Sequence, residues 1–115
     1  MDIHFNGIWK NQNNSRLVLK VTNGIVTGRF ESGVGDDDQV HWVDIQGRVF
    51  NSLIAFNAVY PEYQSIVSWV GQYSFERNKA MIKTFWLYTN ESSNNNEHNL
   101  SWYSNRIGAD VFTKI

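Results

Sequence analysis

Hydrophobic and polar residues alternate with a period of two along almost the whole chain, which is typical of strands that bury one face. No stretch has the spacing of an amphipathic helix of ordinary length. Turn-forming residues divide the pattern into eight predicted strands, which span Gly7–Asn11, Arg16–Thr22, Ile25–Ser32, Val40–Phe50, Leu53–Tyr60, Ser65–Phe75, Ala80–Thr89 and Tyr103–Thr113. Most connections are short, so we expect consecutive strands to pair antiparallel.

This arrangement predicts an all-β fold, an eight-stranded antiparallel up-and-down β-barrel, because closing the sheet removes its exposed edges. The length of 115 residues fits a single domain that spans residues 1–115. The polar segment at residues 90–99 is interpreted as a loop rather than a linker between domains.

Alternation also predicts which side chains face the barrel interior. In the third strand we expect Arg29 and Glu31 to face water, so Phe30, Ser32 and Val34 face inward. The interior is further expected to hold three tryptophans and several polar residues, namely Trp9, Trp69, Trp86, Asn11, Ser65, Thr84 and Asp110. An unpaired polar group in a packed core costs ~1–3 kcal/mol, whereas a pocket for a small ligand needs a few polar groups between aromatic walls. The residues alone leave both a packed barrel and a ligand-holding barrel open.

Composition and charge narrow the classes of partner. The net charge is −1 and the basic residues do not cluster, so we expect neither nucleic acid nor a membrane as a partner. There is no cysteine, which excludes disulfides and thiolate chemistry. The N-terminal sequence has no signal-peptide pattern, although removal of a leader would give the same result.

Two further features argue against an enzyme and a metal site. The three histidines, His4, His41 and His98, are scattered among the predicted strands and loops. The acidic cluster that begins at Asp36 lacks the spacing of a calcium-binding loop. We therefore expect no catalytic residues and no bound metal.

Five segments, in order along the chain, resemble the avidin/streptavidin family of biotin-binding proteins. They are GIWKNQNNS at 7–15, VTGRFESGVG at 26–35, SWVGQY at 68–73, IKTFWLYT at 82–89 and RIGADVFTK at 106–114. The resemblance covers Gly7 to Lys114. It implies a barrel with an internal ligand pocket that binds biotin and biotinylated molecules with high affinity, without catalysis and without a cofactor. It also implies a homo-oligomer, with a tetramer favoured over a dimer, and a secreted or periplasmic location.

The resemblance assigns roles at the end of the pocket that would hold the ureido group of biotin. Asn11 and Ser15 match the donors to the ureido oxygen, whereas Phe30 stands where the family has a tyrosine hydroxyl. Ser32 and Asp110 match the acceptors for the two ureido nitrogens.

The resemblance also implies the walls and the mouth of the pocket. The walls would be formed by Tyr60, Val67, Trp69 and Trp86, with Val67 in place of a threonine near the sulfur. Trp102 matches a tryptophan that a neighbouring subunit lends to the pocket. The ligand carboxylate would meet Ser65 and the loop after the third strand, where Val34 lies and where we expect Asp36 to oppose it.

Phe30 and Val67 depart from the family pattern, so we expect weaker binding than in members with the full pattern. The alternatives are an avidin-like barrel for another small hydrophobic ligand, or an oligomerisation domain with a vestigial biotin pocket. The predicted outer faces of the sixth and seventh strands are apolar, which favours a homo-oligomer; the residues concerned are Ile66, Val70, Met81, Phe85 and Leu87.

Overall fold

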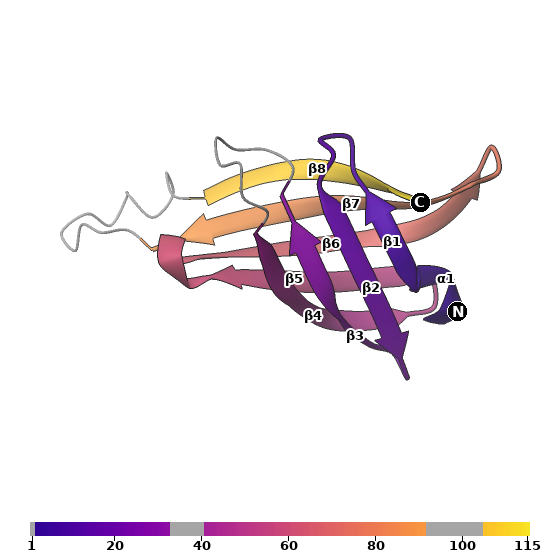
Figure 1. The fold of residues 1–115 in the computed structure, drawn as a ribbon, viewed down its shortest axis with the longest axis horizontal. Helices are drawn as coiled ribbons and strands as arrows, with labels where there is room; N and C mark the ends of the chain where they lie inside the picture. The colour runs from indigo at the N-terminus through magenta and orange to yellow at the C-terminus, as the bar shows by residue number, and fades with distance from the viewer. Residues whose placement is uncertain (1, 33–40, 92–104) are drawn as a thin grey trace.

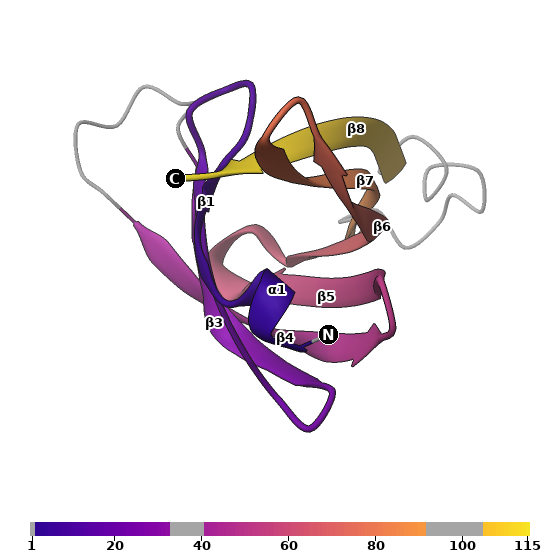
Figure 2. The ribbon, with the colours of Figure 1, turned by 90° about the vertical axis from the view of Figure 1, so that its right-hand side faces the viewer.

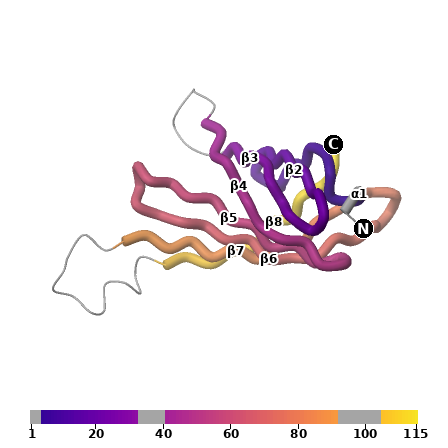
Figure 3. The backbone as a smooth tube through the Cα atoms, turned by 90° about the horizontal axis from the view of Figure 1, so that it is seen from below, coloured from indigo at the N-terminus to yellow at the C-terminus, as the bar shows by residue number. Residues whose placement is uncertain are grey.

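The computed structural model describes residues 2–32, 41–91 and 105–115, which form a closed antiparallel barrel (Figure 1). The strands are β1 (Gly7–Lys10), β2 (Arg16–Thr22), β3 (Ile25–Glu31), β4 (Trp42–Phe50), β5 (Leu53–Tyr60), β6 (Ser65–Glu76), β7 (Lys79–Asn90) and β8 (Asn105–Lys114). Each strand pairs antiparallel with the next, and β1 pairs with β8 to close the ring. The tube in Figure 3 follows the course of the chain from below. The predicted all-β up-and-down barrel is therefore confirmed.

The predicted strand ends differ from the observed ends by no more than one residue wherever both fall in the described part of the chain. Val40 and Tyr103, the predicted starts of two strands, lie outside the described residues. Tight turns account for this agreement. Asn23 and Gly24 between β2 and β3 have φ angles of 53° and 77°, the left-handed conformation that keeps the two strands of a short hairpin paired.

The barrel end that carries the N-terminus is packed solid. A short helix, α1 (Asp2–Phe5), lies across this end (Figure 2), and Phe5 is fully buried. The Trp9 indole Nε1 donates to the Phe5 carbonyl oxygen at 2.9 Å, and the backbone N–H of Val21 donates to Asn6 Oδ1 at 2.6 Å. These bonds tie α1 to β1, and the residue that follows α1 to β2. No helix in the described part of the chain is long and apolar enough to cross a membrane.

One expectation about the third strand is wrong. Glu31 is only 7% exposed instead of lying in water, and its carboxylate pairs with the Arg16 guanidinium at 3.3 Å. Arg16 is its register partner on β2, so the pairing offsets the cost of removing the carboxylate from water. Arg29 is exposed as expected and lies over the Trp42 ring at 5.0 Å.

Candidate functional site

The inner faces of β6, β7 and β8 arrange the site in successive rows. Residues two apart on a strand share a face and lie about 6.6 Å apart, so the register of the three strands defines each row. From the packed end toward the open end, the rows are Gly71–Thr84–Asp110, Trp69–Trp86–Gly108, Val67–Tyr88–Arg106 and the pair Ser65–Asn90.

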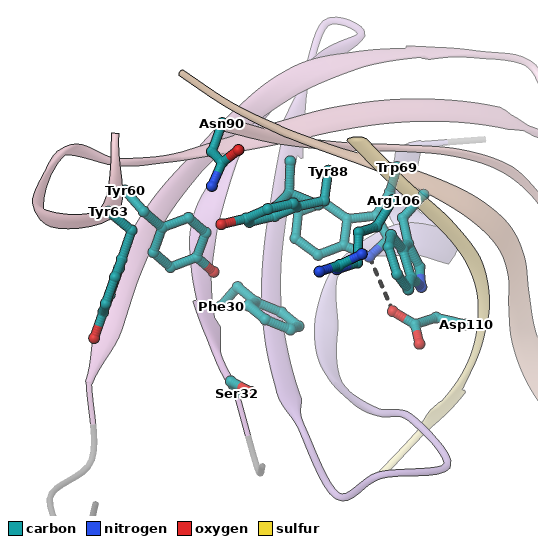
Figure 4. Close-up of a pocket in the computed structure, with 11 residues that line it drawn as sticks. Phe30, Ser32, Tyr60, Tyr63, Trp69, Tyr88, Asn90, Arg106 and Asp110 are labelled. Carbon is teal, nitrogen blue, oxygen red and sulfur yellow. Dashed lines mark hydrogen bonds between the residues drawn. The ribbon is translucent and has the colours of Figure 1, made fainter. Parts of the chain in front are cut away.

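These rows border a cavity of about 650 Å³, a volume in the range of small-molecule pockets. The residues that line it, most of them labelled in Figure 4, are Phe30, Ser32, Tyr60, Tyr63, Val67, Trp69, Trp86, Tyr88, Asn90, Arg106 and Asp110. The short 3-10 helix η1 (Pro61–Tyr63), which connects β5 to β6, contributes Tyr63 at the mouth.

The Asp110 carboxyl group forms the deep polar end of the cavity. The Trp69 indole Nε1 donates to its Oδ2 at 3.0 Å, and the Gln12 amide Nε2 donates to its Oδ1 at 2.9 Å. The Thr84 hydroxyl donates to the backbone carbonyl of Asp110 at 3.0 Å, which fixes the strand beneath the carboxyl group. Because a carboxylate has about four lone-pair positions, the group retains capacity to accept an N–H from a ligand.

Gln12 supports Asp110 by adding side-chain hydrogen bonds between the chain after β1 and β8. The backbones of β1 and β8 pair at two register positions. Beyond those positions, the Gln12 Nε2 donates to the Ala109 carbonyl at 3.2 Å and its Oε1 accepts from the Val111 N–H at 3.0 Å. The Gln12 side chain thus forms the pair of hydrogen bonds to β8 that the backbone of one more β1 residue would form. Sequence reasoning missed this role, because Gln12 lies in a turn and its bonding partners are 97 to 99 residues away.

Aromatic contacts hold the cavity wall in place. The Phe56 ring stacks on Trp69 with ring centroids 5.0 Å apart, and the Phe30 ring lies against the same indole with centroids 4.9 Å apart. Trp86 lies over Gly108, where a Cβ atom would come within 2.2 Å of the indole ring. The absence of a side chain at Gly108 therefore lets the Trp86 ring approach the backbone of β8.

The comparisons with known proteins agree with this geometry. The model of the Avidin family matches residues 1–115. The chain belongs to the avidin family. The crystal structure of xenavidin has 21% sequence identity to this avidin-family chain and a TM-score of 0.83, covering 100% of each chain. The structure of the biotin binding protein from chicken has 21% identity and a TM-score of 0.82, covering 99% of this chain and 98% of that one. The rhizavidin–biotin complex has 24% identity and a TM-score of 0.76, covering 95% and 91%. No curated protein sequence matches the chain.

The structure brings many of the predicted site residues of this avidin-family barrel together. Those that line the cavity are Phe30, Ser32, Tyr60, Val67, Trp69, Trp86 and Asp110. Asn11, Ser15 and Ser65 are buried but are not among the lining residues. The predicted residues Val34, Asp36 and Trp102 lie outside the described residues.

Asn11 is oriented by the turn between β1 and β2. Its side-chain Oδ1 accepts the backbone N–H groups of Asn13 and Ser15, each at 2.9 Å. Asn14 completes the turn with a φ of 65°. The Asn11 oxygen is thus occupied locally, which leaves the amide nitrogen as the group that can donate to a ligand.

The mouth contains residues that sequence reasoning did not assign to the site, namely Tyr63, Tyr88, Asn90 and Arg106. The signal for Tyr88 and Arg106 was present, because alternation places them on the same faces as Trp86 and Asp110. Burial raises the pKa of the Tyr60 phenol, so this hydroxyl stays neutral and able to donate at pH 7. In the described part of the chain, no group of three or more His, Cys, Asp or Glu residues is arranged to hold a metal ion.

Proposed function

We propose that this avidin-family chain is a binding protein, not an enzyme, and that it binds biotin reversibly inside its barrel. The observation that carries the proposal is the buried Asp110 carboxyl group, held by Trp69 and Gln12 at the bottom of an aromatic cavity. The ureido group of biotin is planar and presents two N–H donors and one oxygen acceptor. Asp110 supplies an acceptor for one donor, and the aromatic walls accommodate the apolar bicyclic rings.

The ureido oxygen would be bound by the Asn11 amide nitrogen and the Ser15 hydroxyl, with Ser32 accepting from the second nitrogen. Donors at the oxygen and an acceptor at the nitrogen polarise the ureido group in the same direction, which strengthens each bond. Strands and short turns position these groups, so little conformational entropy is lost on binding. No bond is made or broken, and no cofactor is required.

We propose that the affinity is lower than in family members with the full residue pattern. Phe30 lines the cavity and cannot donate a hydrogen bond to the ureido oxygen. Val67 also lines it and offers no hydroxyl to the ligand sulfur. A hydrogen bond to a charged or strongly polarised group contributes about 1.5–3 kcal/mol, or roughly one to two decades in Kd.

Calorimetry of the purified protein with biotin tests the proposal, with one site per chain expected. Asp110→Ala should weaken binding by roughly ten- to a hundredfold because a charge-assisted hydrogen bond is lost. Asp44→Ala removes an exposed carboxylate from β4 and should leave the Kd unchanged. Folded protein that gives neither heat nor a rise in Tm with excess biotin would refute the proposal and favour another small hydrophobic ligand or a vestigial pocket.

We further propose that the protein is a homo-oligomer, with a tetramer favoured over a dimer. Adjacent strands β6, β7 and β8 carry large apolar side chains on their outer face, and Val70, Phe85, Leu87 and Ile107 are exposed by 60%, 71%, 50% and 75%. In register, Val70 lies beside Phe85 and Leu87 beside Ile107, so they form one patch. Ile66 is also exposed, while Met81 is half-buried. Patches of this kind mark interaction surfaces.

Light scattering tests the assembly. Phe85→Lys should shift the mass toward that of the monomer, because a charge would be buried in the interface. Phe50→Lys replaces an equally exposed phenylalanine on β4 and should not change the mass. A wild-type protein with the monomer mass in dilute buffer would refute the assembly. We also propose a secreted or periplasmic location on the basis of the family resemblance, which fractionation of the producing cells would test.

A further inference from the structure

The cavity carries opposite charges at its two ends. Among the described residues that line it, Asp110 is the one Asp or Glu, and Arg106 is the one Lys, Arg or His. Both lie on the inner face of β8, four residues apart, which corresponds to about 13 Å along the strand. Gly108 stands between them with the Trp86 ring over it. An apolar stretch therefore separates an acceptor at the bottom from a cation at the mouth.

Arg106 is directed toward the cavity. Figure 4 shows its guanidinium group turned into the space that the ring of Tyr88 borders, and Tyr88 is its register partner on β7. Within the described residues, no carboxylate lies within ion-pair distance of Arg106; the ion pairs found there are Arg16–Glu31 and Lys83–Glu76. Asp110 is bonded instead by Trp69 and Gln12. The guanidinium thus presents its donors to the cavity without a described acidic partner.

A second group near the mouth also has an unused hydrogen-bonding atom. Ser65 Oγ is buried and makes no hydrogen bond within the described part of the chain. Ser65 pairs in register with Asn90, which lines the cavity one row beyond Tyr88 and Arg106. Ser65 itself does not line the cavity, so of the two groups it is Arg106 that can bind an anion at the mouth, because guanidinium binds carboxylates through paired N–H groups.

We propose that Arg106 makes the mouth of this cavity selective for ligands that carry a free carboxylate, so that biotin binds more tightly than its neutral esters. The inference rests on the proposed binding of biotin and specifies the charge that the ligand carries at the mouth. A ligand whose polar head reaches Asp110 and whose apolar chain passes Trp86 brings its far end to the row of Arg106. Biotin has this construction, with a ureido head and a carboxylate at the end of an aliphatic chain.

The experiment compares biotin with biotin methyl ester, which has the same rings and chain but no charge. The Kd of each is measured for wild type, Arg106→Leu, Arg106→Lys and Lys20→Leu. Lys20 is an exposed cation on β2, so Lys20→Leu changes the net charge equally without altering the cavity. The preference is the ratio of the two Kd values. Comparing this ratio between proteins cancels contributions common to the variants, including that of Asp36 outside the described residues.

Arg106→Leu should reduce the preference for biotin over the ester by about fivefold, the effect of a partly exposed ion pair. The Kd of the ester should change less than twofold. Arg106→Lys should keep most of the preference, Lys20→Leu should keep all of it, and high salt should reduce it in the wild type. The Tm of each variant establishes that it is folded.

Three results would overturn the inference. Equal preference in wild type and Arg106→Leu would show that Arg106 does not sense the ligand charge, although biotin binding would stand. An equal loss of affinity for both ligands would show that Arg106 packs against the chain of the ligand only. A folded wild-type protein that binds neither ligand would overturn both this inference and the proposed function.

Discussion

The substitution Phe30→Tyr should have opposite effects on the free protein and on its complex with biotin. Phe30 is 6% exposed and lines the cavity, and its ring centroid lies 4.9 Å from that of Trp69. A hydroxyl added to this ring enters a wall that is mostly aromatic. If it finds no protein partner, the unpaired group lowers the free energy of unfolding by about 1 kcal/mol or more.

Bound biotin would supply the missing partner, because the new hydroxyl can donate to the ureido oxygen. A hydrogen bond to a strongly polarised oxygen contributes about 1.5–3 kcal/mol, so the Kd should fall by roughly ten- to a hundredfold. Most of this gain should appear as a slower dissociation rate, because substitutions within one interface change the association rate much less.

The assay combines urea unfolding of the free protein with the dissociation rate of labelled biotin chased by unlabelled biotin. Phe56→Tyr is the matched control, because the Phe56 ring also contacts Trp69, with ring centroids 5.0 Å apart, and Phe56 does not line the cavity. It should lower stability without slowing dissociation. A Phe30→Tyr protein that releases biotin as fast as the wild type, or faster, would refute the assignment of this position to the ureido oxygen.

Three other substitutions test separate parts of the site. Gln12→Leu removes the three hydrogen bonds to β8. It should lower the free energy of unfolding by about 1–3 kcal/mol, measured by urea unfolding, and weaken biotin binding, measured by calorimetry. An unchanged affinity would show that Asp110 does not need this support. Gly108→Ala places a methyl group 2.2 Å from the Trp86 ring, so it should displace the indole, change the tryptophan fluorescence and weaken binding. Burial raises the pKa of Tyr60, so above about pH 10 the folded state keeps a proton that the unfolded state releases, and the free energy of unfolding falls as the pH rises. Tyr60→Phe should therefore lose less stability than the wild type in this range. An equal loss in the wild type and the variant between pH 8 and pH 11 would contradict this.

Much of the barrel could be predicted from the sequence because one face of every strand is buried. A period of two then identifies both the strand and its inner residues, and alternation alone predicts that Trp69, Trp86 and Asp110 lie on one inner surface. The same alternation places Tyr88 and Arg106 on these inner faces, although the family resemblance assigns neither of them a role.

The remaining features depend on contacts that a period cannot encode. The helix α1 has four residues, too few to show a helical repeat. Glu31 is buried because Arg16, on the neighbouring strand, supplies a counter-charge, which alternation along one strand does not reveal. Gln12 acts on β8 through partners at the opposite end of the sequence. For Glu31 and Gln12, the missing information is which residues lie beside them on the neighbouring strand.

The two ends of the cavity should control different properties of binding. At the bottom, Asp110 and Trp69 are fixed by hydrogen bonds and ring contacts within the free protein, and in the proposed complex this end would hold the head group that all biotin derivatives share. At the mouth, Arg106 and Tyr63 come from the first residues of β8 and from η1, and in the proposed complex they would face the part of the ligand that differs between derivatives. Substitutions at the bottom should therefore change the affinity for biotin and its ester by the same factor, whereas substitutions at the mouth should change the ratio between them. A bottom variant such as Asp110→Ala that altered this ratio as strongly as Arg106→Leu would show that the two ends are not independent.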